Sequence, residues 1–167
     1  MPAPSEASAS IRFARPDDAA AILSLITELA EFEHLTHLLV ATEETLRAAL
    51  ADDLPRVECL VAEYEGKVVA YAMYFHNFSS FLTQRGLYLE DLYVSPAARR
   101  MGVASAMLRK LAAIAVERQC ARFEWTVLDW NQSAIDFYEN IGATVMPDWR
   151  VVRMTGEALT KLARGPG

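Results

Sequence analysis

The pattern of apolar and polar residues divides the first part of the chain into one extended and two helical segments. Residues 11–15 alternate apolar and polar side chains, which predicts a short strand. Apolar residues then recur at helical spacing from Ile22 to Leu29, and Asp17 stands where a helix cap is expected. Thr42 is followed by two glutamates and is expected to begin a second helix.

The periodicity changes in the middle of the chain. Residues 57–65 and 68–75 are rich in residues that favour strands, and Gly66-Lys67 between them predicts an antiparallel hairpin. We expect a loop over residues 76–86 and a third strand over residues 87–94. This region therefore predicts the centre of a sheet.

The remaining chain alternates between helices and strands. Gly102 opens a long helix with one apolar face, and residues 121–128 return to a strand. Asn131 is expected to cap a short helix, residues 143–154 to form a final strand, and residues 156–162 a terminal helix. The element order predicts an α+β fold in which helices flank a mixed sheet.

The composition is that of an ordinary globular protein. The chain has 167 residues, 53% of them hydrophobic, which fits one domain over residues 11–163 after a disordered tail at residues 1–10. No apolar stretch approaches the roughly 18 residues of a membrane span. The net charge of −6 disfavours nucleic acid or an anionic membrane as a partner and favours a cationic one. Cys59 and Cys120 form no CxxC motif and are expected to be reduced thiols, as in a cytoplasmic protein.

The stretch LYLEDLYVSPAARRMGVA, residues 87–104, carries the candidate chemistry. Gly102 and Ala104 lack bulky side chains at the start of a helix, so an anion can approach the backbone there. The unpaired N–H groups of a helix start attract anions, and Arg99 and Arg100 add positive charge suited to a pyrophosphate. The alternative is an ordinary strand-to-helix turn with solvated arginines. Neither GxxxxGK[ST] nor GxGxxG occurs, which argues against those nucleotide sites.

Two segments resemble motifs of a known superfamily. Arg99, Gly102 and Ala104 after a strand resemble the acetyl-CoA signature R-x-x-G-x-A of the GNAT superfamily of N-acetyltransferases. WNQSAIDFY at residues 130–138, followed by IGA at residues 141–143, is similar to a second motif of that superfamily. The resemblance implies a central mixed, mostly antiparallel sheet that is flanked by helices and splayed around acetyl-CoA.

A narrower resemblance rests on three further segments. ELAEFE at residues 28–33, YLED at residues 88–91 and Trp149-Arg150 are similar to the diamine/polyamine (spermidine/spermine) acetyltransferases and their thialysine-acetylating relatives. This resemblance implies an enzyme that uses acetyl-CoA as cosubstrate to acetylate a primary amine of a small cationic substrate. It also implies a homodimer, for which the aromatic residues 68–81 are a candidate contact surface.

The superfamily resemblance assigns cofactor contacts to particular positions. The backbone of Leu92, Tyr93 and Val94 would hydrogen-bond the pantetheine arm. Asn131 would contact the cofactor, and Tyr138 would lie near its sulfur. Six residues map onto the pyrophosphate loop: Arg99, Arg100, Met101, Gly102, Val103 and Ala104.

The implied reaction needs a proton acceptor and a proton donor. The amine would attack the acetyl thioester directly, but alkylamines titrate at about 10.4, so well under one percent is neutral at pH 7. Glu90 or Asp91 would take the proton of the amine, and Tyr138 would protonate the CoA thiolate as it leaves. By resemblance, six residues would hold the substrate: Phe32, Glu33, Glu90, Asp91, Asp148 and Trp149.

Several of these features have simpler interpretations. Tyr138 also fits a half-buried helix aromatic packed on the sheet, and the carboxylates also fit solvated surface charges. His34 and His37 have the spacing of two metal ligands, but no third ligand is evident, and they are interpreted as a polar helix end. Arg12 and Arg15 are interpreted as surface charges. At the level of function, the alternatives are a non-catalytic CoA-binding sensor of the same fold and a protein or peptide N-acetyltransferase.

Overall fold

The computed structural model describes residues 9–165, and the chain divides into two compact units, Met1–Thr126 and Val127–Gly167. The single domain over residues 11–163 stays a prediction. Residues 1–8 of the predicted tail lie outside the described residues. Within residues 9–165, no helix is both long enough and apolar enough to cross a bilayer.

A five-stranded sheet forms the centre of the first unit. Its strands are β1 (Ser10–Phe13), β2 (Glu58–Tyr64), β3 (Lys67–Ser79), β4 (Gln84–Val94) and β5 (Phe123–Glu124). The strands lie side by side in chain order. Neighbours from β1 to β4 are antiparallel, and β5 runs parallel to β4. The predicted mixed, mostly antiparallel sheet is confirmed.

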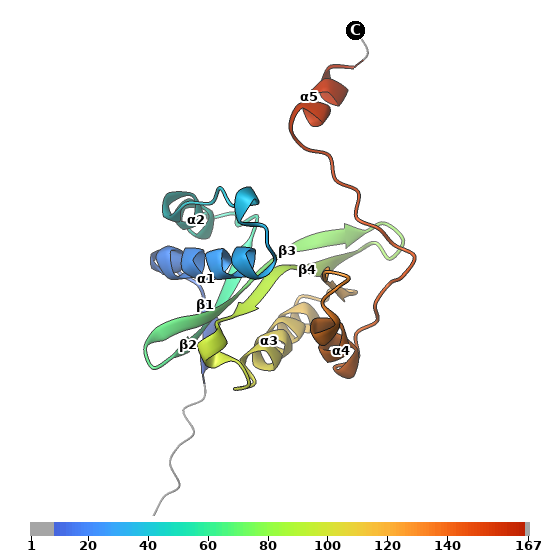
Figure 1. Ribbon diagram of the computed structural model, residues 1–167. Coiled ribbons are helices and arrows are strands. Elements are labelled where there is room, and N and C mark those ends of the chain that lie inside the picture. Colours follow the sequence, from blue (N-terminus) through green and yellow to red (C-terminus); the bar gives the residue numbers. More distant parts are fainter. Residues whose placement is uncertain (1–8, 166–167) are drawn as a thin grey trace, which may run out of the picture. The chain divides into compact units, whose positions relative to one another are not determined.

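Helices cover both faces of this sheet (Figure 1). α1 (Ala19–Phe32) and α2 (Glu43–Leu50) lie on one face, and α3 (Val103–Glu117) lies on the other. The predicted α+β class with flanking helices is therefore confirmed. The two faces of the sheet are therefore distinguished below as the α1 side and the α3 side.

Alternation along the strands decides which side chains lie under α1. Tyr71 of β3 and Tyr93 of β4 pack there against Ile22 and Leu25 of α1. Successive side chains of a regular strand point to opposite faces, so Asp91, two residues before Tyr93 in β4, also belongs to the α1 side. Leu92, which lies between them, belongs to the α3 side.

Two predicted helix starts are confirmed, and one is displaced by a residue. Thr42 caps α2 with its side chain, and Gly102 is the residue before α3. α1 begins after Asp18 rather than after Asp17. The reason is a 3-10 turn over Pro16–Asp18, which carries the chain past Asp17 before the α-helical hydrogen bonds begin.

The β3–β4 hairpin is longer than the side-chain pattern predicts. The predicted loop over residues 76–86 is wrong, because both strands continue until Ser79 pairs with Gln84. Polar residues such as Asn77 interrupt the apolar alternation, but they keep the backbone hydrogen bonds on which a strand depends. The predicted strand over residues 121–128 exists but is much shorter.

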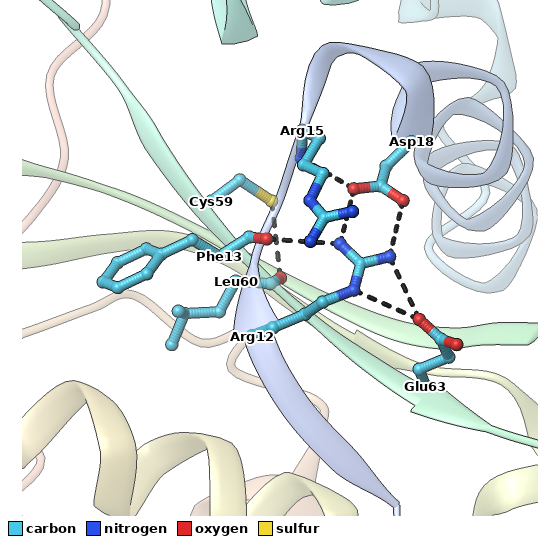
Figure 2. A network of polar contacts seen from close by, with 7 residues as sticks. All are labelled: Arg12, Phe13, Arg15, Asp18, Cys59, Leu60 and Glu63. Atoms are coloured by element: carbon cyan, nitrogen blue, oxygen red, sulfur yellow. Dashed lines mark hydrogen bonds and ion pairs between the residues drawn. The ribbon is translucent and has the colours of Figure 1, made fainter. Parts of the chain in front are cut away.

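A polar network ties β1 to the start of α1 (Figure 2). The Arg12 guanidinium donates to both carboxylate oxygens of Asp18 at 2.8 and 2.9 Å, and its Nε donates to Glu63 at 3.1 Å. Asp18 also accepts the backbone N–H of Arg15 at 2.6 Å. The Arg12 guanidinium chiefly holds the pKa of Asp18 below its usual range. The interpretation of Arg12 as a surface charge is wrong, because its partners are distant residues that the local pattern does not reveal.

The described part of the second unit, residues 127–165, contains two helices. α4 (Gln132–Asn140) is capped as predicted by Asn131, whose side chain accepts the N–H of Ala134 at 3.3 Å. α5 (Gly156–Arg164) confirms the predicted terminal helix. The predicted final strand over residues 143–154 is wrong, since these residues are irregular. Their valines favour a strand, but a strand forms only where a neighbour accepts its backbone hydrogen bonds.

Candidate active site

A β-bulge in β4 lies at the centre of the candidate site. The register with β3 runs from Met73 opposite Asp91 to Tyr74 opposite Leu89, which leaves Glu90 as one extra residue in β4. A bulge bends its strand and re-aims the side chains next to it. The two predicted carboxylates, Glu90 and Asp91, therefore stand at the irregular point of an otherwise continuous strand.

Asp91 is partly buried on the α1 side of the sheet. It lies two residues before Tyr93, which packs under α1. Burial chiefly, together with the negative charges of Glu90 and Glu33, raises the pKa of Asp91 to about 6. The buried hydroxyl of Tyr71 acts in the opposite direction: it lies close enough to lower that pKa, although the contact lacks the geometry of an ordinary hydrogen bond.

The end of α1 supplies a third carboxylate. Glu33 follows Phe32, the last residue of α1, and its backbone N–H donates to the carbonyl of Leu29 at 2.9 Å. Burial raises the pKa of Glu33. The charge of Glu33 acts on Asp91, so the structure brings Glu33, Glu90 and Asp91 together from two elements. Carboxylates whose charges act on one another in this way repel one another and favour a cationic ligand.

The turn after β4 leads into the N-terminus of α3. Gly102 has a φ of 70°, a conformation that glycine adopts without strain, and no side chain caps the helix there. Arg100 and Met101 are exposed, whereas the side chain of Val103 is buried and anchors the helix; Ala104 is partly buried. The first N–H groups of a helix lack partners within it, so this loop can bind an anion through its backbone.

The end of β4 has a free side within the described residues. β5 pairs with β4 only at Leu87 and Tyr88, so no strand lies beside Leu92 on that side in the part of the chain that is described. The carbonyl of Val94 accepts the Nε of Arg99 at 3.2 Å. An unpaired strand edge offers N–H and C=O groups to an extended ligand that carries amides.

Four of the predicted site residues belong to the second unit. Asn131 uses its side chain to cap α4. Tyr138 lies in α4 with its ring 5.5 Å from that of Phe137, and burial raises the pKa of its hydroxyl. Asp148 and Trp149 lie in the irregular segment between α4 and α5, and both are exposed.

Sequence reasoning missed three polar side chains of the first unit. Tyr71 faces Asp91, as described above. The hydroxyl of Tyr93, of which only the backbone was given a role, donates to Glu28 of α1 at 3.2 Å. Glu28 could have been noticed from the sequence, because it is a charged residue beside Leu29, one of the apolar positions of the predicted helix. Tyr71 carried none, since an aromatic residue in an apolar strand predicts only packing.

Comparison with known proteins bears on the family. The sequence profile described as the acetyltransferase (GNAT) family matches residues 20–143. A thialysine N-epsilon-acetyltransferase from Mus musculus is 40% identical over 168 residues, which cover 94% of this chain and 98% of that protein. An L-ornithine N5-acetyltransferase from Arabidopsis thaliana is 34% identical, over 89% of this chain and 85% of that protein.

A solved structure gives the same picture for the fold. An integron cassette protein from V. cholerae superposes with a TM-score of 0.79 at 27% identity, covering 95% of this chain and 99% of that one. Together with the sequence matches, this likeness confirms the resemblance that the two motifs indicate.

Proposed function

The chain belongs to the GNAT family of acetyltransferases, and we propose that it acetylates the primary amine of a small cationic molecule. The observation that carries the proposal is the cluster of Glu33, at the end of α1, with Glu90 and Asp91 of β4, the strand that leads into the loop at residues 99–104. Carboxylates bind ammonium groups, and the loop suits a pyrophosphate. Thialysine and ornithine, which two relatives are named for, are small molecules with a cationic side-chain amine.

Acetyl-CoA is the acetyl donor that the family implies. The uncapped N-terminus of α3 and the open glycine before it fit a diphosphate. We assign its binding to six residues, Arg99, Arg100, Met101, Gly102, Val103 and Ala104. The backbone of Leu92, Tyr93 and Val94 at the free side of β4 would hold the pantetheine arm, and Asn131 would add a contact.

Asp91 is the proposed proton acceptor, directly or through a water molecule. With a pKa of about 6, it is mostly ionised at neutral pH and still basic enough to take a proton. Glu90 is the second candidate, but it is exposed. The choice of Asp91 predicts activity that rises with pH through about 6.

Tyr138 is the proposed proton donor. Burial raises the pKa of its hydroxyl, so the group keeps its proton at neutral pH and can pass it to the CoA thiolate as that group leaves. An ordinary phenol of pKa about 10 that protonates a thiolate whose thiol has a pKa of about 8.5 moves the proton uphill by roughly 2 kcal/mol, which is small beside an enzymatic barrier. The raised pKa of Tyr138 adds to this cost.

The proposal extends to the substrate side and to assembly. Phe32, Asp148 and Trp149 would complete the amine site around Glu33. We further propose a homodimer, which exposed aromatic residues of the β3–β4 hairpin, such as Phe81, support. The cytoplasmic location stays a prediction.

The experiment that tests the function measures CoA release from acetyl-CoA across a panel of amines. The panel holds thialysine, ornithine, lysine, spermidine, putrescine and several peptides. We expect turnover with one or more of the small amines and a loss of about 100-fold or more in kcat with Tyr138→Phe. Tyr64→Phe, a change at the last residue of β2, is the control and should retain activity.

The panel also separates the alternatives. Turnover confined to peptides would favour a protein or peptide acetyltransferase. Measurable binding of acetyl-CoA without turnover on any amine would favour the CoA-binding sensor. Full activity of Tyr138→Phe would assign the proton donor to another group.

A further inference from the structure

A chain of polar contacts connects α1 with Arg99, the first residue of the loop at residues 99–104. The hydroxyl of Tyr93 donates to Glu28 at 3.2 Å, and Nη2 of Arg99 donates to the hydroxyl of Tyr93 at 3.4 Å. The guanidinium of Arg99 also lies over the Tyr93 ring, with Cζ 5.7 Å from the ring centroid. Its Nε donates to the carbonyl of Val94 at 3.2 Å. Three contacts, two with Tyr93 and one with Val94, therefore hold the Arg99 side chain.

The tyrosine between the two charges has a defined role in this chain. Tyr93 is only 7% exposed, and its hydroxyl both donates to Glu28 and accepts from Arg99, which satisfies its ordinary hydrogen-bonding capacity. Burial and the charge of Glu28 raise the pKa of Tyr93, so the hydroxyl stays protonated and keeps this donor direction. A neutral hydroxyl thus links the carboxylate of α1 to the arginine of the loop.

We propose that Glu28 and Tyr93 are positioning residues that hold Arg99 at the start of the loop and so increase the affinity for the pyrophosphate of acetyl-CoA. Their side chains do this without contact with the cofactor. A free arginine side chain loses rotamer freedom when it binds a phosphate, and an arginine fixed beforehand has less freedom to lose. The inference rests on the proposed use of acetyl-CoA and adds two residues for which the signature motif has no place.

The first test removes only the hydroxyl. Tyr93→Phe keeps the ring under the guanidinium but loses both hydrogen bonds. We expect the Kd for CoA, measured by isothermal titration calorimetry, to rise roughly three- to tenfold, which is the effect of losing the one hydrogen bond that holds Arg99 directly. Tyr74→Phe is the matched control, since Tyr74 is also fully buried and its hydroxyl donates to Glu58 at 3.3 Å on the α3 side. This control should leave the Kd unchanged.

A double-mutant cycle separates positioning from a general loosening of the fold. In an Arg99→Gln background there is no guanidinium to hold, so Tyr93→Phe should no longer change the Kd for CoA. An equal weakening with and without Arg99 would overturn the proposal. Glu28→Gln should act in the same direction as Tyr93→Phe and lose its effect in the same background, which keeps the test decisive if Tyr93→Phe folds poorly.

A second ligand gives an independent readout. Pantetheine lacks the pyrophosphate, so its inhibition constant against acetyl-CoA should be the same for the wild type and Tyr93→Phe, whereas a distorted β4 would weaken pantetheine as well. Failure of the wild type to bind CoA would contradict the proposed function itself. CoA binding by the wild type with additive effects of Tyr93→Phe and Arg99→Gln would overturn only this inference.

Discussion

Asp18 and Asp91 are two carboxylates on the α1 side of the sheet, and their surroundings move their pKa values in opposite directions. Asp18 accepts the Arg12 guanidinium and the backbone N–H of Arg15, and its pKa lies below the usual range. Asp91 has a pKa of about 6. Asp18 is buried, whereas Asp91 is only partly buried.

The difference between the two lies in what each carboxylate meets. Donors surround Asp18, so its charge is neutralised within the fold and contributes to stability. Negative charges surround Asp91, and the nearby hydroxyl of Tyr71 offsets them only weakly. A folded protein tolerates an unsatisfied charge where function uses it, since the ligand then completes the missing contacts. Asp18 has its partners within the fold, whereas under the proposed function a cationic amine would supply the partner of Asp91.

The largest expected effect is the loss of activity when the charge of Asp91 is removed. Asp91→Asn keeps the shape of the side chain but cannot accept a proton, so kcat/KM for the preferred amine should fall about 100- to 10,000-fold. In the wild type, kcat/KM should rise as pH increases through about 6, the pKa of Asp91. Initial rates between pH 5 and pH 9 would test both statements.

The control for this loss is Asp53→Asn, a change in an exposed residue between α2 and β2 that should leave the rate unaltered. Near-normal activity of Asp91→Asn would exclude Asp91 as the proton acceptor, and loss of activity in Glu90→Gln would then assign that role to Glu90. The comparison with Asp18 would then concern stability alone.

The next largest expected effect is the loss of stability when the charge of Asp18 is removed. Asp18→Asn removes the carboxylate that Arg12 holds, and we expect the free energy of unfolding at pH 7 to fall by about 2–3 kcal/mol. Because the folded-state pKa of Asp18 is lowered, this stability is present above the usual value of 3.8 and is lost as pH falls through the folded-state pKa. Urea unfolding at several pH values would measure it.

The neighbouring Asp17 provides the matched control for that experiment. Its carboxylate pairs with Arg47 at 2.7 Å but is 94% exposed, so Asp17→Asn should change stability by less than about 1 kcal/mol. Equal losses for the two variants would show that Asp18 contributes no more than a surface ion pair.

Local pattern predicted the parts of the fold that depend on local signals. The caps at Thr42 and Asn131 and the turn at Gly66 need particular residue types, and the structure has them there. The full length of the β3–β4 hairpin and the irregular state of residues 143–154 depend on which backbone groups find a partner elsewhere. The alternation of apolar and polar side chains does not indicate which backbone groups will be paired.

The candidate site divides along the same line. The loop that begins at Arg99 could be predicted, because a strand end, two arginines and small residues follow one another in the chain. The pKa of Asp91 could not, since it depends on burial and on Glu33, which belongs to another element. The link from Arg99 through Tyr93 to Glu28 likewise joins residues that only the packing of α1 against β4 brings together.

The smallest expected effect is a gain in stability from Asp91→Asn, opposite in sign to the loss expected from Asp18→Asn. The folded-state pKa of Asp91, about 6, lies above the usual 3.8, so between these values the folded protein holds a proton that the unfolded chain has lost. Stability therefore falls as pH rises from about 4 to 6, and the whole penalty remains above pH 6. Asp91→Asn should raise the free energy of unfolding at pH 8 by about 1–3 kcal/mol and change it little at pH 4.

Urea unfolding of Asp91→Asn at pH 8 and pH 4 measures this gain, and Glu90→Gln provides its control. Glu90 is exposed and only adds to the repulsion at Asp91, so Glu90→Gln should stabilise the protein less. If Asp91→Asn were no more stable than the wild type at pH 8, burial of the ionised Asp91 carboxylate would cost the fold no free energy. We therefore expect Asp91→Asn to stabilise the fold and to lose activity, and Asp18→Asn only to destabilise the fold. A carboxylate that a protein keeps for binding a ligand behaves as Asp91 does, and one that it keeps for stability behaves as Asp18 does.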